Sequence, residues 1–134
     1  ESTALFGIFP YVAVLMEAQG AGGAAEAGLA LAGFALGGLA YTAMVAMLLR
    51  RLGLAKMLIG GGFLCAASLM LVSVASNWVV YFVALAGLGL GFYMLHNSFQ
   101  TQVSEVAPNA RASAIALHAF SFFSGQARAV VLVG

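Results

Sequence analysis

Residues 78–99, which read WVVYFVALAGLGLGFYMLHNSF, decide the fold because they contain no Asp, Glu, Lys or Arg. About 20 consecutive apolar residues in a helix span the hydrocarbon core of a bilayer. The stretch is too long for a single barrel strand, and its apolar and polar residues do not alternate. It therefore predicts a membrane-spanning helix.

The rest of the chain has the same character. Hydrophobic residues make up 63% of its 134 residues and charged residues 7%, against roughly 45–50% and about 25% in soluble proteins. We predict an all-α polytopic membrane protein with one transmembrane domain over residues 1–134. Its expected spans, about five, are residues 3–16, 27–49, 54–75, 78–99 and 112–134. The first and last spans look short or uncapped, so we expect the domain to be incomplete at both ends.

Several function classes are excluded at this stage. The few basic residues form no stripe that could neutralise a row of phosphates, so nucleic-acid binding is not expected. A single cysteine, Cys65, provides neither an internal disulfide nor a thiolate metal cluster. The stretch Gly87–Gly91 follows no strand and is not a dinucleotide fingerprint. We expect no enzyme, no cofactor and no metal.

The positions of the charges predict how the chain crosses the membrane. Arg50, Arg51 and Lys56 cluster between the second and third expected spans, and basic residues in short loops mark the cytoplasmic side. Trp78 and Tyr81 fall at the opposite interface, where aromatic rings with a polar edge prefer to lie. The first span is therefore expected to start in the cytoplasm.

Glycines inside the spans predict close helix packing. Gly33 and Gly37 are four residues apart, as are Gly87 and Gly91, and small residues at this spacing let two helix backbones approach in lipid. Tight packing is one interpretation. The other is a pair of surfaces that slide during a transport cycle.

Polar residues at membrane depth are the candidate functional residues, because they are costly to bury in lipid. Tyr93 and Asn97 are four residues apart, as are His96 and Gln100, so each pair shares a helix face. This polar run lines either a cavity or gate, or else it supplies hydrogen bonds between helices.

Four other residues are polar or charged and lie in or near the expected spans. Glu17 is either a solvated loop charge or a proton-coupling carboxylate, and His118 is either a packing residue or a proton relay. Gln126 and Arg128 lie deep in the last span, and the chain has no Asp to pair with Arg128. Either the missing part of the protein supplies a partner for the arginine, or this region is strained.

Two motifs carry a family resemblance. Residues 46–56, AMLLRRLGLAK, resemble the loop signature G-x-x-x-D-R-x-G of the major facilitator superfamily, with Arg51 and Gly53 matching and Ala46 and Arg50 departing from it. Residues 96–126 resemble the H-N-x-x-Q-T, E-x-x-P-x-x-R and F-x-G-Q motifs of its bacterial drug-efflux-like members.

This resemblance implies helices seven to eleven of the carboxy-terminal half, with the six-helix amino-terminal half missing. It implies a multi-pass protein of the bacterial inner membrane that exports small organic molecules in exchange for protons by alternating access. The implied substrate or proton pathway comprises Glu17, Tyr93, His96, Asn97, Gln100, His118 and Gln126. The implied cytoplasmic gating loop comprises Arg50, Arg51, Gly53 and Lys56. A membrane structural or interaction protein without a transport cycle is the alternative.

Overall fold

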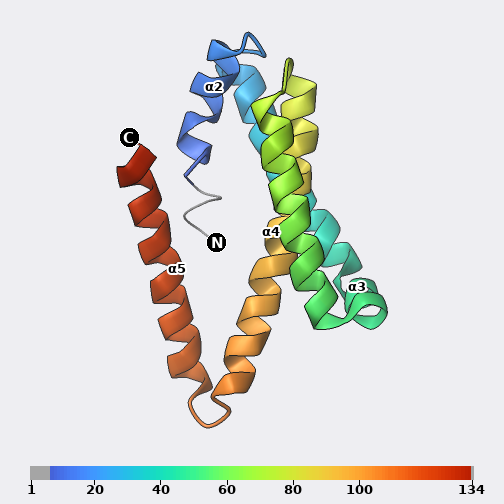
Figure 1. Ribbon diagram of the computed structural model, residues 1–134, viewed down its shortest axis with the longest axis vertical. Helices are drawn as coiled ribbons and strands as arrows, with labels where there is room; N and C mark the ends of the chain where they lie inside the picture. Colours follow the sequence, from blue (N-terminus) through green and yellow to red (C-terminus); the bar gives the residue numbers. More distant parts are fainter. Residues whose placement is uncertain (1–6, 134) are drawn as a thin grey trace. The chain divides into compact units, whose positions relative to one another are not determined.

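The computed structural model describes residues 7–133, and every regular element in this part of the chain is helical, which confirms the all-α prediction. The predicted first span begins at residue 3, so its first residues lie outside the described part, as do Glu1 and Gly134. The elements shown in Figure 1 are the 3-10 turn η1 (Phe9–Tyr11) and the helices α2 (Val12–Ala18), α3 (Ala24–Ser73), α4 (Trp78–Val106) and α5 (Arg111–Val133).

The chain divides into two compact units. The first, called here the hairpin unit, comprises Val12–Leu95 and so contains α2, α3 and most of α4. The second, called the histidine unit, contains residues 7–11 and 96–133 of the described part, and so the end of α4 and all of α5. Each unit is described by itself.

In the hairpin unit, α3 is two helices joined at a bend. Gly53 has φ 71° and ψ 168°, a backbone conformation that is open essentially to glycine alone. A straight helix of 50 residues would be about 75 Å long, more than twice the roughly 30 Å of a bilayer core. Figure 1 shows α3 doubling back at this bend. The connection predicted between the second and third spans is thus a single non-helical residue, and Arg50, Arg51 and Lys56 lie in the helical turns beside it.

Close contact between α3 and α4 holds the hairpin unit together. A β-carbon at Gly37 would overlap the carbonyl oxygen of Ala86, and one at Gly89 would overlap that of Phe34. Beyond the bend, a β-carbon at Gly61 would lie 2.9 Å from the carbonyl oxygen of Gly91. Helices this close require glycine, so the predicted close packing is confirmed.

A small core forms where both arms of α3 meet α4. Tyr41 comes from the first arm, Met57 from the second and Met94 from α4, and all three are buried. Partly buried apolar side chains surround them: Val45, Leu48, Leu90 and Tyr93. The bend at Gly53 therefore brings both arms of α3 against α4.

At the other end of the hairpin unit, hydrogen bonds fix the helix ends. The hydroxyl of the fully buried Tyr81 donates to Oε1 of Gln19 over 2.8 Å, which ties α4 to the segment after α2. The Glu26 carboxylate accepts from the backbone N–H of Gly23 at the start of α3. Asn77 caps α4, because its Oδ1 accepts from the N–H of Val80.

In the histidine unit, α4 continues beyond the span predicted for it. The sequence has no Gly or Pro between His96 and Val106, so the helix continues to Val106, two residues before Pro108. A turn closed by a bond from the N–H of Ala110 to the carbonyl of Ala107 leads into α5.

Fewer helices than expected meet the length and hydropathy requirements of a span. Within the described residues only α3 and α4 do so, and the bend at Gly53 divides α3 into two arms. The segment Phe9–Ala18 is too short, and α5 is interrupted by polar residues along its length. By length and hydropathy, this part of the chain thus has fewer candidate spans than the five predicted.

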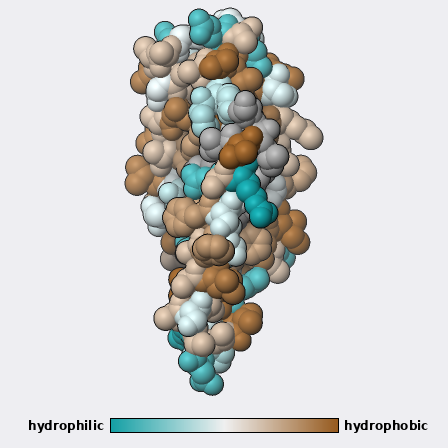
Figure 2. Space-filling model, turned by 90° about the vertical axis from the view of Figure 1, so that its left-hand side faces the viewer, coloured by the Kyte–Doolittle hydropathy of each residue, from teal (hydrophilic) through white to brown (hydrophobic). Residues whose placement is uncertain are grey.

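The surface is strongly apolar all the same. Figure 2 shows apolar side chains over much of one face. Large hydrophobic residues are widely exposed, among them Ile59, Phe63, Met70, Phe120 and Val131. Exposed apolar surface on this scale suits contact with lipid better than contact with water.

Candidate functional site

The candidate site is a group of four side chains in the histidine unit. His96 and Gln100 lie one turn apart on α4, and the Gln100 side-chain nitrogen is 3.1 Å from Nε2 of His96. The contact joins the Gln100 amide to the imidazole, and the donor in this bond is set by the tautomer of the ring. This contact confirms that the two residues share a helix face.

Helix α5 brings a second histidine to the first. The ring centroids of His118 and His96 lie 5.7 Å apart at an interplanar angle of 37°. Phe122, one turn after His118, packs on His96 with its centroid 4.8 Å away. Two imidazoles and a phenyl ring thus form one cluster between two helices.

The cluster includes an unsatisfied polar atom. Nε2 of His118 is buried and has no hydrogen-bond partner within residues 7–133. A buried polar group without a partner lowers the stability of the fold by about 1–3 kcal/mol. Such groups are therefore rare in natural proteins and are often linked to function. Proton exchange with a neighbouring group is one such function, because histidine gains and loses protons near neutral pH.

Sequence reasoning missed two residues of this region. Phe122 stands four residues after His118, and this spacing could have identified it as a neighbour on the same face. Ser98 is 2% exposed, and its hydroxyl has no partner within the described residues. Because Ser98 is two residues from His96, it lies about 200° around α4 and outside the cluster.

Tyr93, another predicted pathway residue, is part of an aromatic group in the hairpin unit. It stacks on Tyr41 with ring centroids 6.2 Å apart and meets Phe92 edge to face at 5.3 Å. The absence of a side chain at Gly38 makes room for its ring. This arrangement gives Tyr93 a packing role in the described structure.

The remaining predicted residues range from half-buried to exposed. Glu17 is exposed at the end of α2, and Gln126 is half-buried on α5. Asn97 is half-buried on α4, and its backbone carbonyl accepts a hydrogen bond from the Thr101 hydroxyl. Arg128 is exposed and forms no ion pair in the part of the chain that is described.

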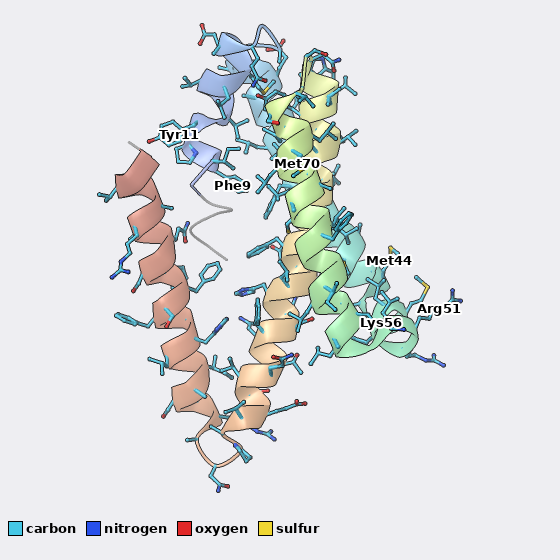
Figure 3. All side chains as sticks on the ribbon, viewed as in Figure 1. Phe9, Tyr11, Met44, Arg51, Lys56 and Met70 are labelled. Carbon is cyan, nitrogen blue, oxygen red and sulfur yellow. The ribbon has the colours of Figure 1, made fainter. Side chains whose placement is uncertain are left out.

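The predicted gating loop is at the bend of α3. Figure 3 shows Arg51 and Lys56 beside the bend with their side chains directed outward, and Arg50 is exposed as well. Gly53 provides the positive φ angle on which the bend depends. These residues form a basic patch on the hairpin unit.

Comparison with known proteins places the chain in a family. The sequence model of the Major Facilitator Superfamily matches residues 2–129, almost the whole chain. No curated protein and no solved structure gives a significant match. With its apolar helices, the match identifies an integral membrane protein of a transporter family, which acts on small molecules across a lipid bilayer. The chain belongs to the major facilitator superfamily.

Proposed function

We propose that this transporter exports small organic molecules in exchange for protons and that His96 and His118 carry the proton. The observation that supports this proposal is the ring pair of the two histidines at 5.7 Å, in helices that are otherwise largely apolar. Ionisable residues in membrane helices commonly belong to proton or substrate pathways.

Proton binding at His96 would change its hydrogen bond with Gln100. In the neutral tautomer with its proton on Nδ1, Nε2 accepts from the amide nitrogen of Gln100. Protonation turns both ring nitrogens into donors, so the amide must turn its oxygen toward the ring or the bond breaks. A proton on His96 also repels one on the nearby His118.

The other parts of the proposal rest on family resemblance and on charge. A second six-helix half would complete the transporter, and the two halves would expose the substrate site to each side in turn. Glu17, Tyr93, Asn97 and Gln126 would contribute to the pathway. The basic patch at the bend favours a cytoplasmic location for it, with the first span starting in the cytoplasm of a bacterial inner membrane.

The test is a flux assay on the full-length transporter in proteoliposomes. We expect a pH gradient to drive accumulation of at least one compound from a broad panel of organic cations and neutral drugs, and an ionophore that collapses the gradient to abolish it. Flux of the same rate with and without the pH gradient would contradict proton coupling. A folded protein that moves no compound at all would favour the structural or interaction alternative.

A further inference from the structure

A groove runs along α3 just before the bend. It encloses about 570 Å³ and is lined by Ala43, Ala46, Met47, Arg50 and Arg51. These positions follow the spacing i, i+3, i+4, i+7 and i+8, so they form one continuous face of the helix. The five lining residues all belong to the hairpin unit.

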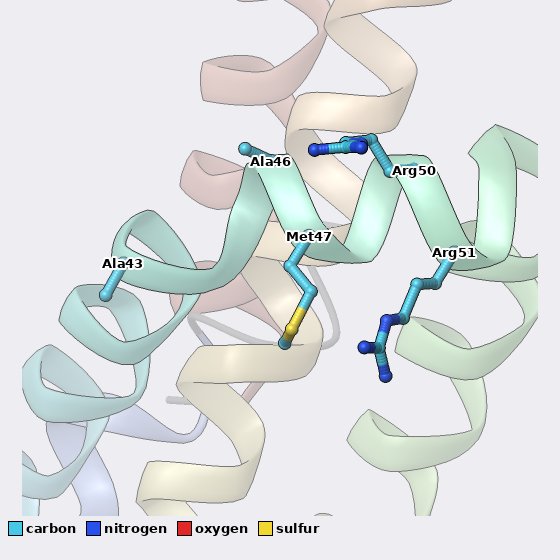
Figure 4. Close-up of a pocket in the computed structure, with 5 residues that line it drawn as sticks. All are labelled: Ala43, Ala46, Met47, Arg50 and Arg51. Carbon is cyan, nitrogen blue, oxygen red and sulfur yellow. The ribbon is translucent and has the colours of Figure 1, made fainter.

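The groove has two chemically distinct ends. Figure 4 shows the Arg50 side chain running back toward Ala46, and the side chains of Met47 and Arg51 pointing to a common side. Both arginines therefore come from the last turns before the bend, with the Arg50 guanidinium lying toward Ala46 and the Arg51 guanidinium on the side of Met47. Small and apolar side chains, those of Ala43, Ala46 and Met47, form the remainder.

The positive charges at this end are not neutralised within the described structure. Neither Arg50 nor Arg51 forms an ion pair within residues 7–133. The sequence contains no Asp, and the nearest acidic residue along α3, Glu26, caps the far end of the helix. Two adjacent arginines repel each other, so an anion bound between them would be attracted by both.

We propose that this groove binds an anionic phospholipid. The phosphate would accept hydrogen bonds from Arg50 and Arg51, since guanidinium groups suit phosphate oxygens. An acyl chain would follow the apolar part past Met47 and along the exposed apolar surface of α3, which includes Leu39 and Met44. This apolar continuation favours a lipid over a free phosphate. Basic pockets at the end of membrane helices are typical sites for such headgroups.

The test measures lipid binding to the purified full-length transporter by native mass spectrometry. The probes are phosphatidylglycerol, phosphatidylcholine of the same acyl chains, and water-soluble glycerophosphoglycerol. We expect phosphatidylglycerol to bind more tightly than both. The double variant Arg50→Gln/Arg51→Gln should bind it about thirtyfold more weakly, because each basic residue contributes roughly a fivefold preference.

Two further variants separate a binding site from overall charge and from misfolding. Arg111→Gln/Arg128→Gln removes the same charge from exposed positions on α5 and should retain the preference for phosphatidylglycerol. Arg50→Lys/Arg51→Lys keeps the charge and should retain most of the preference for phosphatidylglycerol.

Three results would overturn the proposal. The first is equal binding of the two phospholipids to the wild-type protein. The second is a loss of preference as large in the α5 control as in Arg50→Gln/Arg51→Gln. The third is glycerophosphoglycerol binding as tightly as phosphatidylglycerol, which would indicate a site for a free anion. None of these measurements depends on whether the transporter moves protons.

Discussion

The imidazole rings of His96 and His118 lie 5.7 Å apart, one on α4 and the other on α5, although 22 positions separate them in the sequence. Gln100 bonds to the first ring, while Nε2 of the second is buried without a partner in the described residues. This asymmetry suggests different roles for the two histidines. His96 is held by a hydrogen bond to Gln100, whereas the buried Nε2 of His118 has no such bond in the described residues.

Replacing His118 with Asn should remove proton coupling while leaving the fold intact. Asparagine is polar and of similar reach but does not titrate, so we expect gradient-driven flux to fall at least tenfold. Exchange of labelled for unlabelled substrate without a gradient should continue, because it needs no net proton movement. Both rates can be measured on the same proteoliposomes. Equal losses in the two assays would point to a packing role for His118.

Adding one methyl group at Gly37 should weaken the hairpin unit. Its β-carbon would overlap the backbone carbonyl of Ala86, which cannot swing aside, so α3 and α4 must separate. We expect Gly37→Ala to lower the free energy of unfolding in detergent by about 1–3 kcal/mol. The matched control is Gly28→Ala, where a β-carbon meets no atom within 4 Å. Its greater helix propensity should make that variant as stable as the wild type or slightly more so.

Gly53→Ala tests the bend of α3. Alanine strongly disfavours φ 71° with ψ 168°, so the substitution should cost about 1–3 kcal/mol of unfolding free energy. Gly60→Ala is the comparison, because its β-carbon would make an ordinary 3.6 Å contact with Cε of Met94. If thermal unfolding in detergent shows equal stability for both variants, the bend does not depend on glycine.

The Tyr81–Gln19 hydrogen bond can be measured with a double-mutant cycle. Tyr81→Phe removes the donor and should cost about 0.5–1.5 kcal/mol, since the ring keeps its buried position. Gln19→Ala in the Tyr81→Phe background should then cost less than it does alone. Strictly additive effects on unfolding free energy would mean that the bond contributes no stability.

The basic patch at the bend makes a separate prediction about orientation. Replacing Arg50, Arg51 and Lys56 together with Gln should weaken the cytoplasmic bias of this segment in a tagged-terminus accessibility assay. The control replaces Glu17 and Glu26 with Gln, because acidic residues contribute little to orientation. An unchanged orientation in the basic triple variant would refute the charge argument.

The sequence predicted those features of the fold and site that depend on local spacing. The pairing of His96 with Gln100 follows from a four-residue step on one helix. The close approach at Gly37 was expected from small residues at the same step, although its partner Ala86 could not be named.

Features that depend on how helices meet were not predictable from spacing. The approach of His118 to His96 is set by how α5 folds back after the turn near Pro108, which no periodicity in the sequence encodes. The connection expected between spans around Arg50 proved to be helical, because arginine and leucine are good helix formers and a single glycine suffices for the bend.

Simultaneous recording of substrate and proton movement in proteoliposomes of the full-length transporter tests the central claim most directly. A weakly buffered pH indicator outside the vesicles would report protons while a labelled compound reports substrate. We expect substrate and protons to move in opposite directions at a fixed ratio, and the variant His96→Asn/His118→Asn to lose the proton signal. Substrate movement with no proton movement in the wild type, or an unchanged proton signal in that variant, would contradict the claim.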